Sequence, residues 1–450
     1  MNVHIKGSYS EKLVSADEAV KCVKSGDFIF YGEFAMAPPP SLDTALAKRV
    51  DELYGVIFGG TSFTALPEVV KADPTGEHFN MQDYHFGGVS RRLHDQDLCY
   101  YVPIAYHQVP RFIHKYVEMD VALIQVGPMN DKGFFNLGPS NSGTLAFCSK
   151  ATKIIVEVNN KVPTCWGGNS EFIHIDSVDM IVEGNNPVLV QVKPAQPTDT
   201  DRMIAELVME EIRDGSCLQL GIGGLPNVIG AMIAASDLKD LGVHTEMLAD
   251  SYMDMYQAGR ITGNRKGIDK EKMVYTFAMG TKKLYDFLDN NPLCASYPVN
   301  YTNDPRMIAM NDRVIAINNA LQVDLYSQVA SESFGNRQIS GTGGQLDFML
   351  GAFQSHGGKG FICISSTYKD NECEIQSRII PTLSPATIVT LPRSLTHFIV
   401  TEYGIAQMKG KSTWQRAEAL INIAHPMFRD ELIKQAQELK IWRHSSKQDA

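Results

Sequence analysis

Short apolar runs rich in β-branched residues alternate along the first half of the chain with longer amphipathic stretches. The first run is followed by an amphipathic stretch at residues 41–53, which predicts a helix. The runs that predict strands lie at residues 28–32, 121–127, 153–159 and 177–183. Strand and helix in repeated succession predict a parallel or mixed sheet covered by helices, which is an α/β fold.

The second half of the chain repeats this pattern. Residues 199–215 place Ile204, Leu207, Val208 and Ile212 at helical spacing, so we expect an amphipathic helix that Gly215 ends. A turn and a helix are expected at residues 224–236, and a helical tail at residues 414–442. Strands are expected at residues 217–223, 242–248, 272–280, 313–325, 359–367 and 387–392.

A proline-rich and polar segment at residues 185–200 separates the two halves. Such a composition is typical of a linker between domains. We therefore predict two tandem α/β domains of similar open-sheet type, at residues 1–195 and 196–450.

Composition narrows the classes of function. The net charge of −10, from 51 acidic and 41 basic residues, argues against a nucleic-acid-binding protein. The chain shows neither a leader-like amino terminus nor an apolar run long enough to cross a membrane, so we expect a cytoplasmic enzyme with no membrane partner. The eight cysteines and twelve histidines have no metal-ligand spacing, so no metal site is expected.

A glycine cluster follows the predicted strand at residues 217–223. Gly221, Gly223 and Gly224 precede a predicted helix that has Pro226 near its start. Backbone N–H groups at such a turn can bind an anion, although the turn can also be purely structural. A P-loop is excluded because no Gly-Lys pair follows, whereas a dinucleotide site with Glu246 as the ribose ligand stays open, with Pro226 in place of its third glycine.

Glu246 lies at the carboxyl end of the strand predicted at residues 242–248, the edge at which open α/β sheets bind ligands. A solvated surface charge is the simpler interpretation of a single glutamate. A second glycine cluster at residues 340–348 offers further backbone donors, and Gly343 and Gly344 are candidates to stabilise an oxyanion. A carboxylate near such donors can attack a thioester and carry an acyl group or CoA covalently.

Five segments together resemble a known family. They are VALIQVGPMNDKGFFNLG at residues 121–138, LQLGIGGLPNVIG at 218–230, GVHTEMLAD at 242–250, SGTGGQLDF at 340–348 and VTEYGIAQMKGKS at 400–412. In this order they resemble the acetyl-CoA hydrolase/transferase branch of the family I CoA-transferases, and within it the butyryl-CoA:acetate and 4-hydroxybutyrate CoA-transferases. The resemblance extends from about residue 12 to about residue 432.

The resemblance implies an active site in the cleft between two similar α/β domains and a homo-oligomeric enzyme. It implies that Glu246 becomes a glutamyl-CoA thioester, with CoA as substrate and covalent intermediate and no permanently bound cofactor. It further implies that Glu402 lies near the active site and that the segment from Tyr31 to Pro38 closes the acyl pocket. Within this segment, Glu33, Phe34 and Met36 would bear on the length of the acyl chain. Asn319 is a candidate to orient the nucleophile. The implied CoA contacts are Gly221, Ile222, Gly223, Gly224, Leu225, Leu321 and Gly344.

Four functions are compatible with these features. The first is a CoA-transferase that moves CoA between a short-chain acyl-CoA and a carboxylate such as acetate. The second is an acyl-CoA hydrolase in which water discharges the same intermediate. The third is a nicotinamide-dependent oxidoreductase, and the fourth is a non-catalytic CoA-binding subunit.

Overall fold

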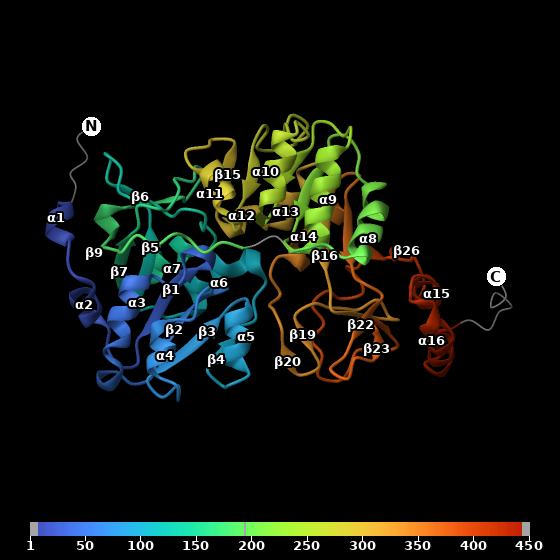
Figure 1. The fold of residues 1–450 in the computed structure, drawn as a ribbon, viewed down its shortest axis with the longest axis horizontal. Coiled ribbons are helices and arrows are strands. Elements are labelled where there is room, and N and C mark those ends of the chain that lie inside the picture. The colour runs from blue at the N-terminus through green and yellow to red at the C-terminus, as the bar shows by residue number, and fades with distance from the viewer. Residues whose placement is uncertain (1–7, 193–194, 443–450) are drawn as a thin grey trace. The chain divides into compact units, whose positions relative to one another are not determined.

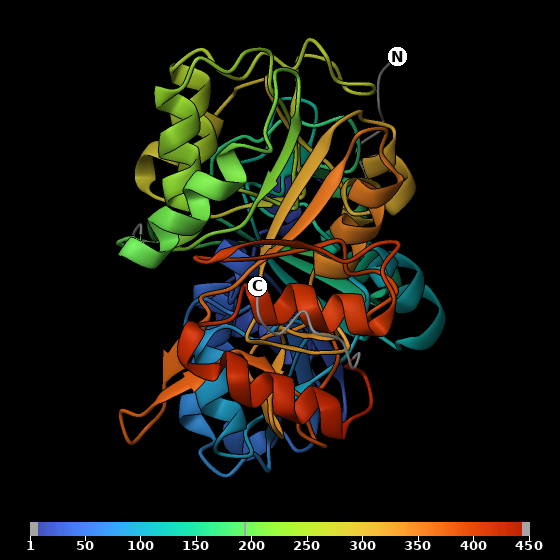
Figure 2. The same cartoon turned by 90° about the vertical axis from the view of Figure 1, so that its right-hand side faces the viewer.

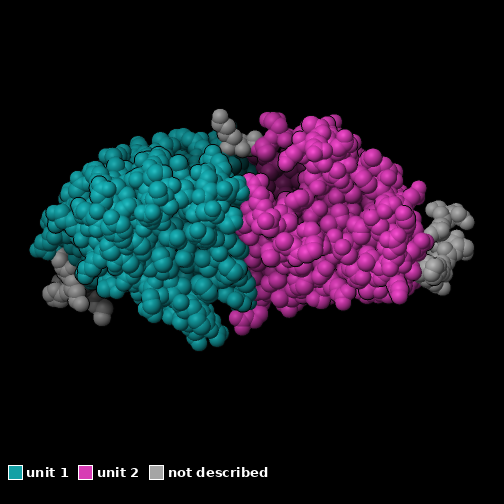
Figure 3. Space-filling model, turned by 90° about the horizontal axis from the view of Figure 1, so that it is seen from below, with its two compact units in different colours: residues 1–193, 244–253, 272–304 teal, residues 194–243, 254–271, 305–450 magenta. Residues whose placement is uncertain are grey.

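The computed structural model describes residues 8–192 and 195–442, and the chain forms two compact units (Figure 3). The first unit comprises Met1–Lys193, His244–Met253 and Lys272–Asp304. The second comprises Pro194–Val243, Asp254–Glu271 and Pro305–Ala450. Two segments from the second half of the sequence, one of which holds Glu246, thus belong to the first unit.

Two expectations from the sequence involve residues outside the described ranges. The boundary expected between residues 195 and 196 lies next to residues 193 and 194, which are not described, so it stays a prediction. Residues 1–7, on which the expectation about a leader partly rests, are not described either. None of the helices in the described ranges is long and apolar enough to cross a membrane.

The first unit is built on a seven-stranded sheet with the order β4-β3-β2-β1-β5-β7-β9, and its neighbouring strands are parallel (Figure 1). The strands are β1 (Phe28–Glu33), β2 (Val56–Thr61), β3 (Phe79–Asp83), β4 (Cys99–Tyr101), β5 (Val121–Val126), β7 (Lys153–Val158) and β9 (Met180–Glu183). The helices of this half are α1 (Tyr9–Lys12), α2 (Ala16–Ala19), α3 (Pro40–Ala47), α4 (Glu68–Ala72), α5 (Gly88–His94), α6 (Val109–Tyr116) and α7 (Thr144–Lys150). Single 3₁₀ turns are η1 (Val20–Cys22), η2 (Phe34–Met36), η3 (Val50–Glu52), η4 (Tyr106–Gln108) and η5 (Ile175–Ser177).

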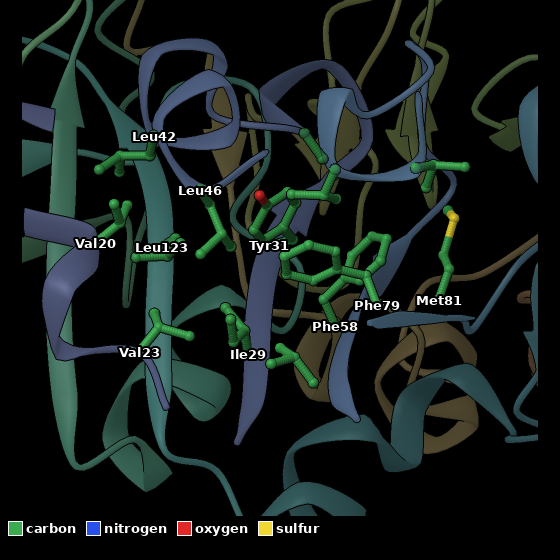
Figure 4. Packing of buried hydrophobic residues seen from close by; sticks show 14 of the residues in the cluster. Val20, Val23, Ile29, Tyr31, Leu42, Leu46, Phe58, Phe79, Met81 and Leu123 are labelled. Carbon is green, nitrogen blue, oxygen red and sulfur yellow. The ribbon is translucent and has the colours of Figure 1, made fainter. Parts of the chain in front are cut away.

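Most residues in the strands of this sheet are apolar because both faces of the sheet are buried, although β3 also contains Asn80, Gln82 and Asp83. Ile29 and Tyr31 of β1 belong to one hydrophobic core, whereas Phe30 between them belongs to the other. Figure 4 shows the first of these cores, in which Ile29 and Phe58 from the strands lie with Leu46 from α3. The apolar runs of the sequence thus predicted β1, β5, β7 and β9, whereas β2, β3 and β4 were not among the predicted strands.

The segments that join the first unit from the second half are short. Strand β12 (Met247–Leu248) pairs with β14 (Phe277–Ala278), and β13 (Met273–Tyr275) pairs with β15 (Cys294–Ser296), both in parallel. Two antiparallel strands, β6 (Phe134–Asn136) and β8 (Phe172–His174), complete the strands of the unit. The helices here are α10 (Asp250–Gln257), which begins in this unit, α11 (Lys282–Leu288) and α12 (Val299–Thr302).

The second unit contains sheet strands in the order β11-β10-β16-β21-β25-β26. They are β10 (Cys217–Leu220), β11 (Gly242–His244), β16 (Val314–Asn319), β21 (Lys359–Cys363), β25 (Phe398–Thr401) and β26 (Gly404–Gln407). Neighbouring strands in this order are parallel, except that β25 and β26 are antiparallel. Shorter strands are β17 (Gln322–Asp324), β18 (Val329–Ala330), β19 (Ser333–Phe334), β20 (Arg337–Gln338), β22 (Thr367–Lys369), β23 (Ile375–Ser377) and β24 (Ile379–Ile380). The helices are α8 (Asp199–Met209), α9 (Gly224–Ala235), α13 (Pro305–Ala309), α14 (Gln345–Gln354), α15 (Thr413–Asn422) and α16 (Pro426–Glu438).

Helices α15 and α16 form the predicted helical tail and are the two red helices in Figure 2. The tail is broken between Asn422 and Pro426 because the residue before a proline disfavours helical backbone. Leu420 of α15 and Leu432 of α16 are buried in the same core as Ile362 of β21 and Ile399 of β25. The predicted α/β class is confirmed for both units.

Several predicted elements differ from the structure. The strands expected at residues 242–248 and 272–280 are each divided in two, the first into β11 and β12 and the second into β13 and β14. The helix expected to run to Gly215 ends at Met209, because the N–H groups of Glu211 and Ile212 bond three residues back rather than four. The strand expected at residues 387–392 is wrong. The N–H groups of Thr390 and Leu391 both donate to the carbonyl of Val329, so only one bridge forms and no ladder continues.

Candidate functional site

Glu246 belongs to the first unit and lies between two strands rather than within one. Strand β11 ends at His244 and β12 begins at Met247, and the carbonyl of Glu246 accepts hydrogen bonds from the N–H groups of Thr276 (3.0 Å) and Phe277 (3.2 Å). Thr245 and Met247 on either side are buried, whereas Glu246 is half-buried. The backbone is thus fixed while the carboxylate keeps access to solvent.

The side chain of Glu246 is oriented by Asn303, which is fully buried. The Asn303 Nδ2 donates to Glu246 Oε2 over 2.6 Å. Asn303 ends helix α12, where its own N–H donates to the carbonyl of Val299. A hydrogen bond from a fixed amide to a carboxylate is stronger than one between neutral groups, so this contact holds one oxygen of Glu246 in place.

Sequence reasoning did not find Asn303. An asparagine at the end of a helix is commonly a structural residue, and Asn303 lies far from Glu246 along the chain. Only the fold brings the two side chains together.

The expected acyl-pocket residues lie in different surroundings. The ring of Phe34 stacks on Phe277, with centroids 3.6 Å apart and planes 7° apart, and the N–H of Phe277 donates to Glu246. Phe34 has a φ of 51°, a conformation that is costly for an aromatic residue and that concentrates at functional sites. The fold therefore brings Phe34 to the segment that supports Glu246.

Tyr31 and Met36 are placed elsewhere in the first unit. Tyr31 is fully buried in the core opposite the one that contains Phe30, and its hydroxyl donates to Asp43 Oδ1 over 3.0 Å. Met36 is buried beside Gly138. A cavity next to this segment is lined by residues that include Ala35, Ala37, Pro38, Leu66 and Gln125.

The first glycine loop lies in the second unit, between β10 and α9. Gly223 has a φ of 125°, which side chains other than glycine rarely adopt, and it precedes the first turn of α9. A β-carbon on Gly224 would lie 2.6 Å from a carboxylate oxygen of Asp201, so this position also requires glycine. Ile222 is exposed and Leu225 is buried. The loop thus presents backbone at the positive end of a twelve-residue helix.

The second glycine cluster also lies in the second unit, at the start of α14. Gly343 has a φ of 51°, and Gly344 directly precedes the helix. The first helical residue, Gln345, donates from Nε2 to the carbonyl of Asn319 over 2.8 Å. The fold therefore brings Asn319 and Gly344 together. Leu321 is half-buried, and its N–H donates to the carbonyl of Ala330.

Glu402 lies at the turn between β25 and β26. Its Oε2 accepts a hydrogen bond from the N–H of Ser366 over 2.9 Å, and its Oε1 accepts a short one from the Ser366 hydroxyl. Both carboxylate oxygens thus contact a buried serine of the same unit. In residues 8–192 and 195–442, no group of three or more His, Cys, Asp or Glu side chains is arranged to hold a metal ion.

Comparison with known proteins places these residues in a family. Residues 2–193 match the acetyl-CoA hydrolase/transferase N-terminal domain, and residues 280–436 match the acetyl-CoA hydrolase/transferase C-terminal domain. The chain belongs to the acetyl-CoA hydrolase/transferase family. The resemblance drawn from the five sequence segments is thereby confirmed.

Members of this family with curated functions cover almost the whole chain. The butyryl-CoA:acetate CoA-transferase of Anaerostipes caccae is 53% identical over 445 residues, which is 98% of this chain and 99% of that protein. The 4-hydroxybutyrate coenzyme A transferase of Clostridium kluyveri is 39% identical over 95% of this chain and 97% of that protein. The crystal structure of a 4-hydroxybutyrate CoA-transferase from Porphyromonas gingivalis has a TM-score of 0.78 at 32% identity, covering 96% of this chain and 98% of that chain.

Proposed function

We propose that this protein is a CoA-transferase that exchanges CoA between a short-chain acyl-CoA and a carboxylate such as acetate. In this proposal the reaction passes through a glutamyl-CoA thioester on Glu246. The observation that carries the proposal is the half-buried Glu246 carboxylate, fixed by the Asn303 amide at a strand end, in a chain of the acetyl-CoA hydrolase/transferase family.

The reaction begins with attack of a Glu246 oxygen on the acyl-CoA carbonyl. This forms a mixed anhydride and releases CoA thiolate. The thiolate attacks the glutamyl carbonyl, which forms the glutamyl-CoA thioester and releases the first acid with one oxygen from Glu246. An incoming acetate then attacks this thioester, and the released thiolate attacks the acetyl carbonyl. Acetyl-CoA leaves, and Glu246 regains a carboxylate that contains one oxygen from acetate.

The geometry around Glu246 suits this sequence of attacks. The amide of Asn303 fixes the direction of the Glu246 carboxylate. The nucleophile is thus oriented before the substrate binds, so the reaction does not have to restrict its rotation. The backbone on both sides of Glu246 is buried and hydrogen-bonded, so the glutamyl carbonyl stays in one position when it becomes the electrophile.

The remaining roles belong to the same proposal. In the second unit, Gly221 to Leu225, Leu321 and Gly344 bind CoA, and the N–H groups of Gly343 or Gly344 stabilise the oxyanions. Glu402 and Asn319 assist in binding the acid or in orienting the nucleophile, and Tyr31, Phe34 and Met36 bear on acyl-chain length. The names of the relatives support butyryl-CoA or 4-hydroxybutyryl-CoA as donor. The enzyme is proposed to act in the cytoplasm as a homo-oligomer.

A variant at Glu246 tests the proposal. We expect wild-type protein to show ping-pong kinetics with butyryl-CoA and acetate, and Glu246→Gln to lose activity because an amide cannot form the anhydride. Glu206→Gln, on an exposed face of α8, serves as the control and should retain wild-type rates. Full activity of Glu246→Gln would exclude the proposed intermediate.

An acyl-CoA hydrolase is the second candidate, because the curated relatives include an acetyl-CoA hydrolase of Saccharomyces cerevisiae that is 25% identical. Release of free thiol separates the two functions. A transferase releases little thiol from butyryl-CoA without acetate and forms acetyl-CoA when acetate is added. Equal thiol release with and without acetate would favour the hydrolase.

A further inference from the structure

A second glutamate of the first unit, Glu33, is completely buried at the end of β1. A buried carboxylate is costly unless hydrogen bonds compensate for the lost water. Burial raises the pKa of Glu33, against the opposing effect of its hydrogen bonds to Thr61, Gly143, Ser142 and Thr144. A buried carboxylate such as that of Glu33 therefore indicates a role other than packing.

Four donors surround the Glu33 carboxylate. Its Oε1 accepts hydrogen bonds from Thr61 Oγ1 (2.8 Å) and Ser142 Oγ (3.0 Å). Its Oε2 accepts from the Gly143 N–H (2.9 Å) and from Thr144 Oγ1 (3.1 Å). Three of the four donors belong to residues 142–144, so Glu33 anchors the buried loop that leads into α7.

The anchored loop contacts the strand segment that supports Glu246. The Ser142 N–H donates to the carbonyl of Thr276 over 3.1 Å, and the N–H of Ala278 donates to the carbonyl of Pro139 over 2.8 Å. Thr276 in turn donates its own N–H to the carbonyl of Glu246. A single peptide segment thus connects the loop to the backbone of Glu246.

The same loop also contacts the helix that positions Asn303. The N–H of Val299, the first residue of α12, donates to the carbonyl of Ser142 over 2.9 Å. Helix α12 ends at Asn303, whose amide holds the Glu246 carboxylate. Ser142 therefore bonds to both supports of Glu246, the strand segment and the helix.

Tyr106 adds a third connection. Its hydroxyl lies 2.5 Å from Ser142 Oγ, and because the Ser142 proton is donated to Glu33, Tyr106 is the donor to Ser142. Tyr106 is buried, and burial together with the negative charges of Glu33 and Glu246 holds its pKa well above the usual range. The phenol is thus within electrostatic reach of both carboxylates.

We propose that Glu33 is a positioning residue for Glu246, and that it acts by anchoring residues 140–144 against the strand segment and the helix that hold Glu246. This inference rests on the proposed function, because it concerns the rate at which Glu246 forms its thioester. It assigns Glu33 no contact with substrate. The inference is independent of the role in acyl-chain length that the resemblance implies for Glu33, Phe34 and Met36.

The test compares two buried glutamates of the first unit. Glu157 is as buried as Glu33, and it accepts hydrogen bonds from the N–H groups of Ser41 and Leu42 at the start of α3 instead. We expect Glu33→Gln to lower the single-turnover rate of glutamyl-CoA formation by about 10- to 100-fold, with the KM for butyryl-CoA within about threefold of wild type. The matched Glu157→Gln should retain the wild-type rate within about twofold while showing a comparable change in thermal stability.

If Glu33→Gln does not fold, the milder variant Ser142→Ala tests the inference instead. Ser142→Ala removes the link between Glu33 and Tyr106, and we expect it to slow thioester formation as well. The double variant Glu33→Gln/Ser142→Ala should be about as slow as the slower single variant, because both changes release the same loop. Where only Ser142→Ala folds, its wild-type rate of thioester formation would overturn the inference.

The outcomes separate this inference from the proposed function. If wild-type protein forms the thioester on Glu246 and Glu33→Gln forms it at the same rate, the positioning role is wrong and the proposed function stands. Equal losses in Glu33→Gln and Glu157→Gln would also overturn the positioning role, because both would then reflect packing. If wild-type protein forms no thioester on Glu246, the proposed function fails and the inference fails with it.

Discussion

Replacement of Asn303 by alanine probes the contact that orients Glu246. The change removes the Nδ2 donor that lies 2.6 Å from Glu246 Oε2 and leaves the backbone N–H of residue 303 to end α12 as before. Hydrogen bonds to charged groups contribute about 1.5–3 kcal/mol. Each 1.36 kcal/mol corresponds to about a tenfold change in rate, so thioester formation should slow by about 10- to 150-fold.

The assay is a single-turnover reaction with saturating butyryl-CoA, stopped at short times and followed by mass spectrometry of the peptide that contains Glu246. Asn159→Ala is the control, because Asn159 is equally buried in the same unit and bonds to Gln125 and the carbonyl of Pro187 instead. Asn303→Asp should be slower than Asn303→Ala at neutral pH, since a second carboxylate would face Glu246.

A wild-type rate in Asn303→Ala would refute the reasoning, because the amide would then contribute nothing to the nucleophile. Equal losses in the Asn303 and Asn159 variants would refute it too, since both would then reflect a general loss of packing.

Three further predictions concern other parts of the fold. Gly223→Ala should raise the KM for butyryl-CoA about tenfold, because a side chain is strained at a φ of 125°. Gly259→Ala, at a φ of 75° in a turn outside the site, should leave the KM unchanged. Steady-state kinetics of the two variants measure the difference. Phe34→Ala should lower the stability of the first unit by about 3 kcal/mol through loss of the stacked Phe277 contact, and an unchanged thermal midpoint would contradict this. Burial raises the pKa of Asp83 from 3.8 to about 7. The folded state therefore binds the Asp83 proton more tightly than the unfolded state does. This contribution to stability is complete below about pH 4 and is lost as the pH rises through 7. Asp83→Asn should therefore flatten the fall in thermal midpoint between pH 5 and pH 8, and an unchanged slope would show that Asp83 is not its source.

The sequence predicted the parts of the fold that depend on local pattern. Strands β5 and β7 are mostly apolar, with Gln125 in β5 and Lys153 and Glu157 in β7 as the exceptions, and both were found where expected because a strand buried on both faces needs few polar positions. The strand expected at residues 387–392 has a similar composition. It fails because the partner backbone offers a single carbonyl, that of Val329, which no local pattern reveals.

Some residues of the candidate site are indicated by local sequence, whereas others are brought together only by the fold. Glu246 is a candidate from the sequence because it lies at a strand end, where open α/β sheets bind ligands, and its catalytic role stays a prediction. Asn303 was not predictable as part of the site, and Glu33 was named only as an acyl-pocket residue, because their hydrogen bonds join segments far apart in the chain. Phe34 was named from the resemblance, but its stacking on Phe277 is a tertiary contact.

The most direct test of the account follows an oxygen atom. Wild-type protein is turned over with butyryl-CoA and acetate labelled with oxygen-18, and the peptide that contains Glu246 is then analysed by mass spectrometry. The proposed chemistry predicts that this peptide gains one oxygen-18 atom and that the same peptide from Glu246→Gln gains none. An unlabelled Glu246 peptide after many turnovers to acetyl-CoA would contradict the account, because the acid would then have exchanged CoA without passing through the glutamate.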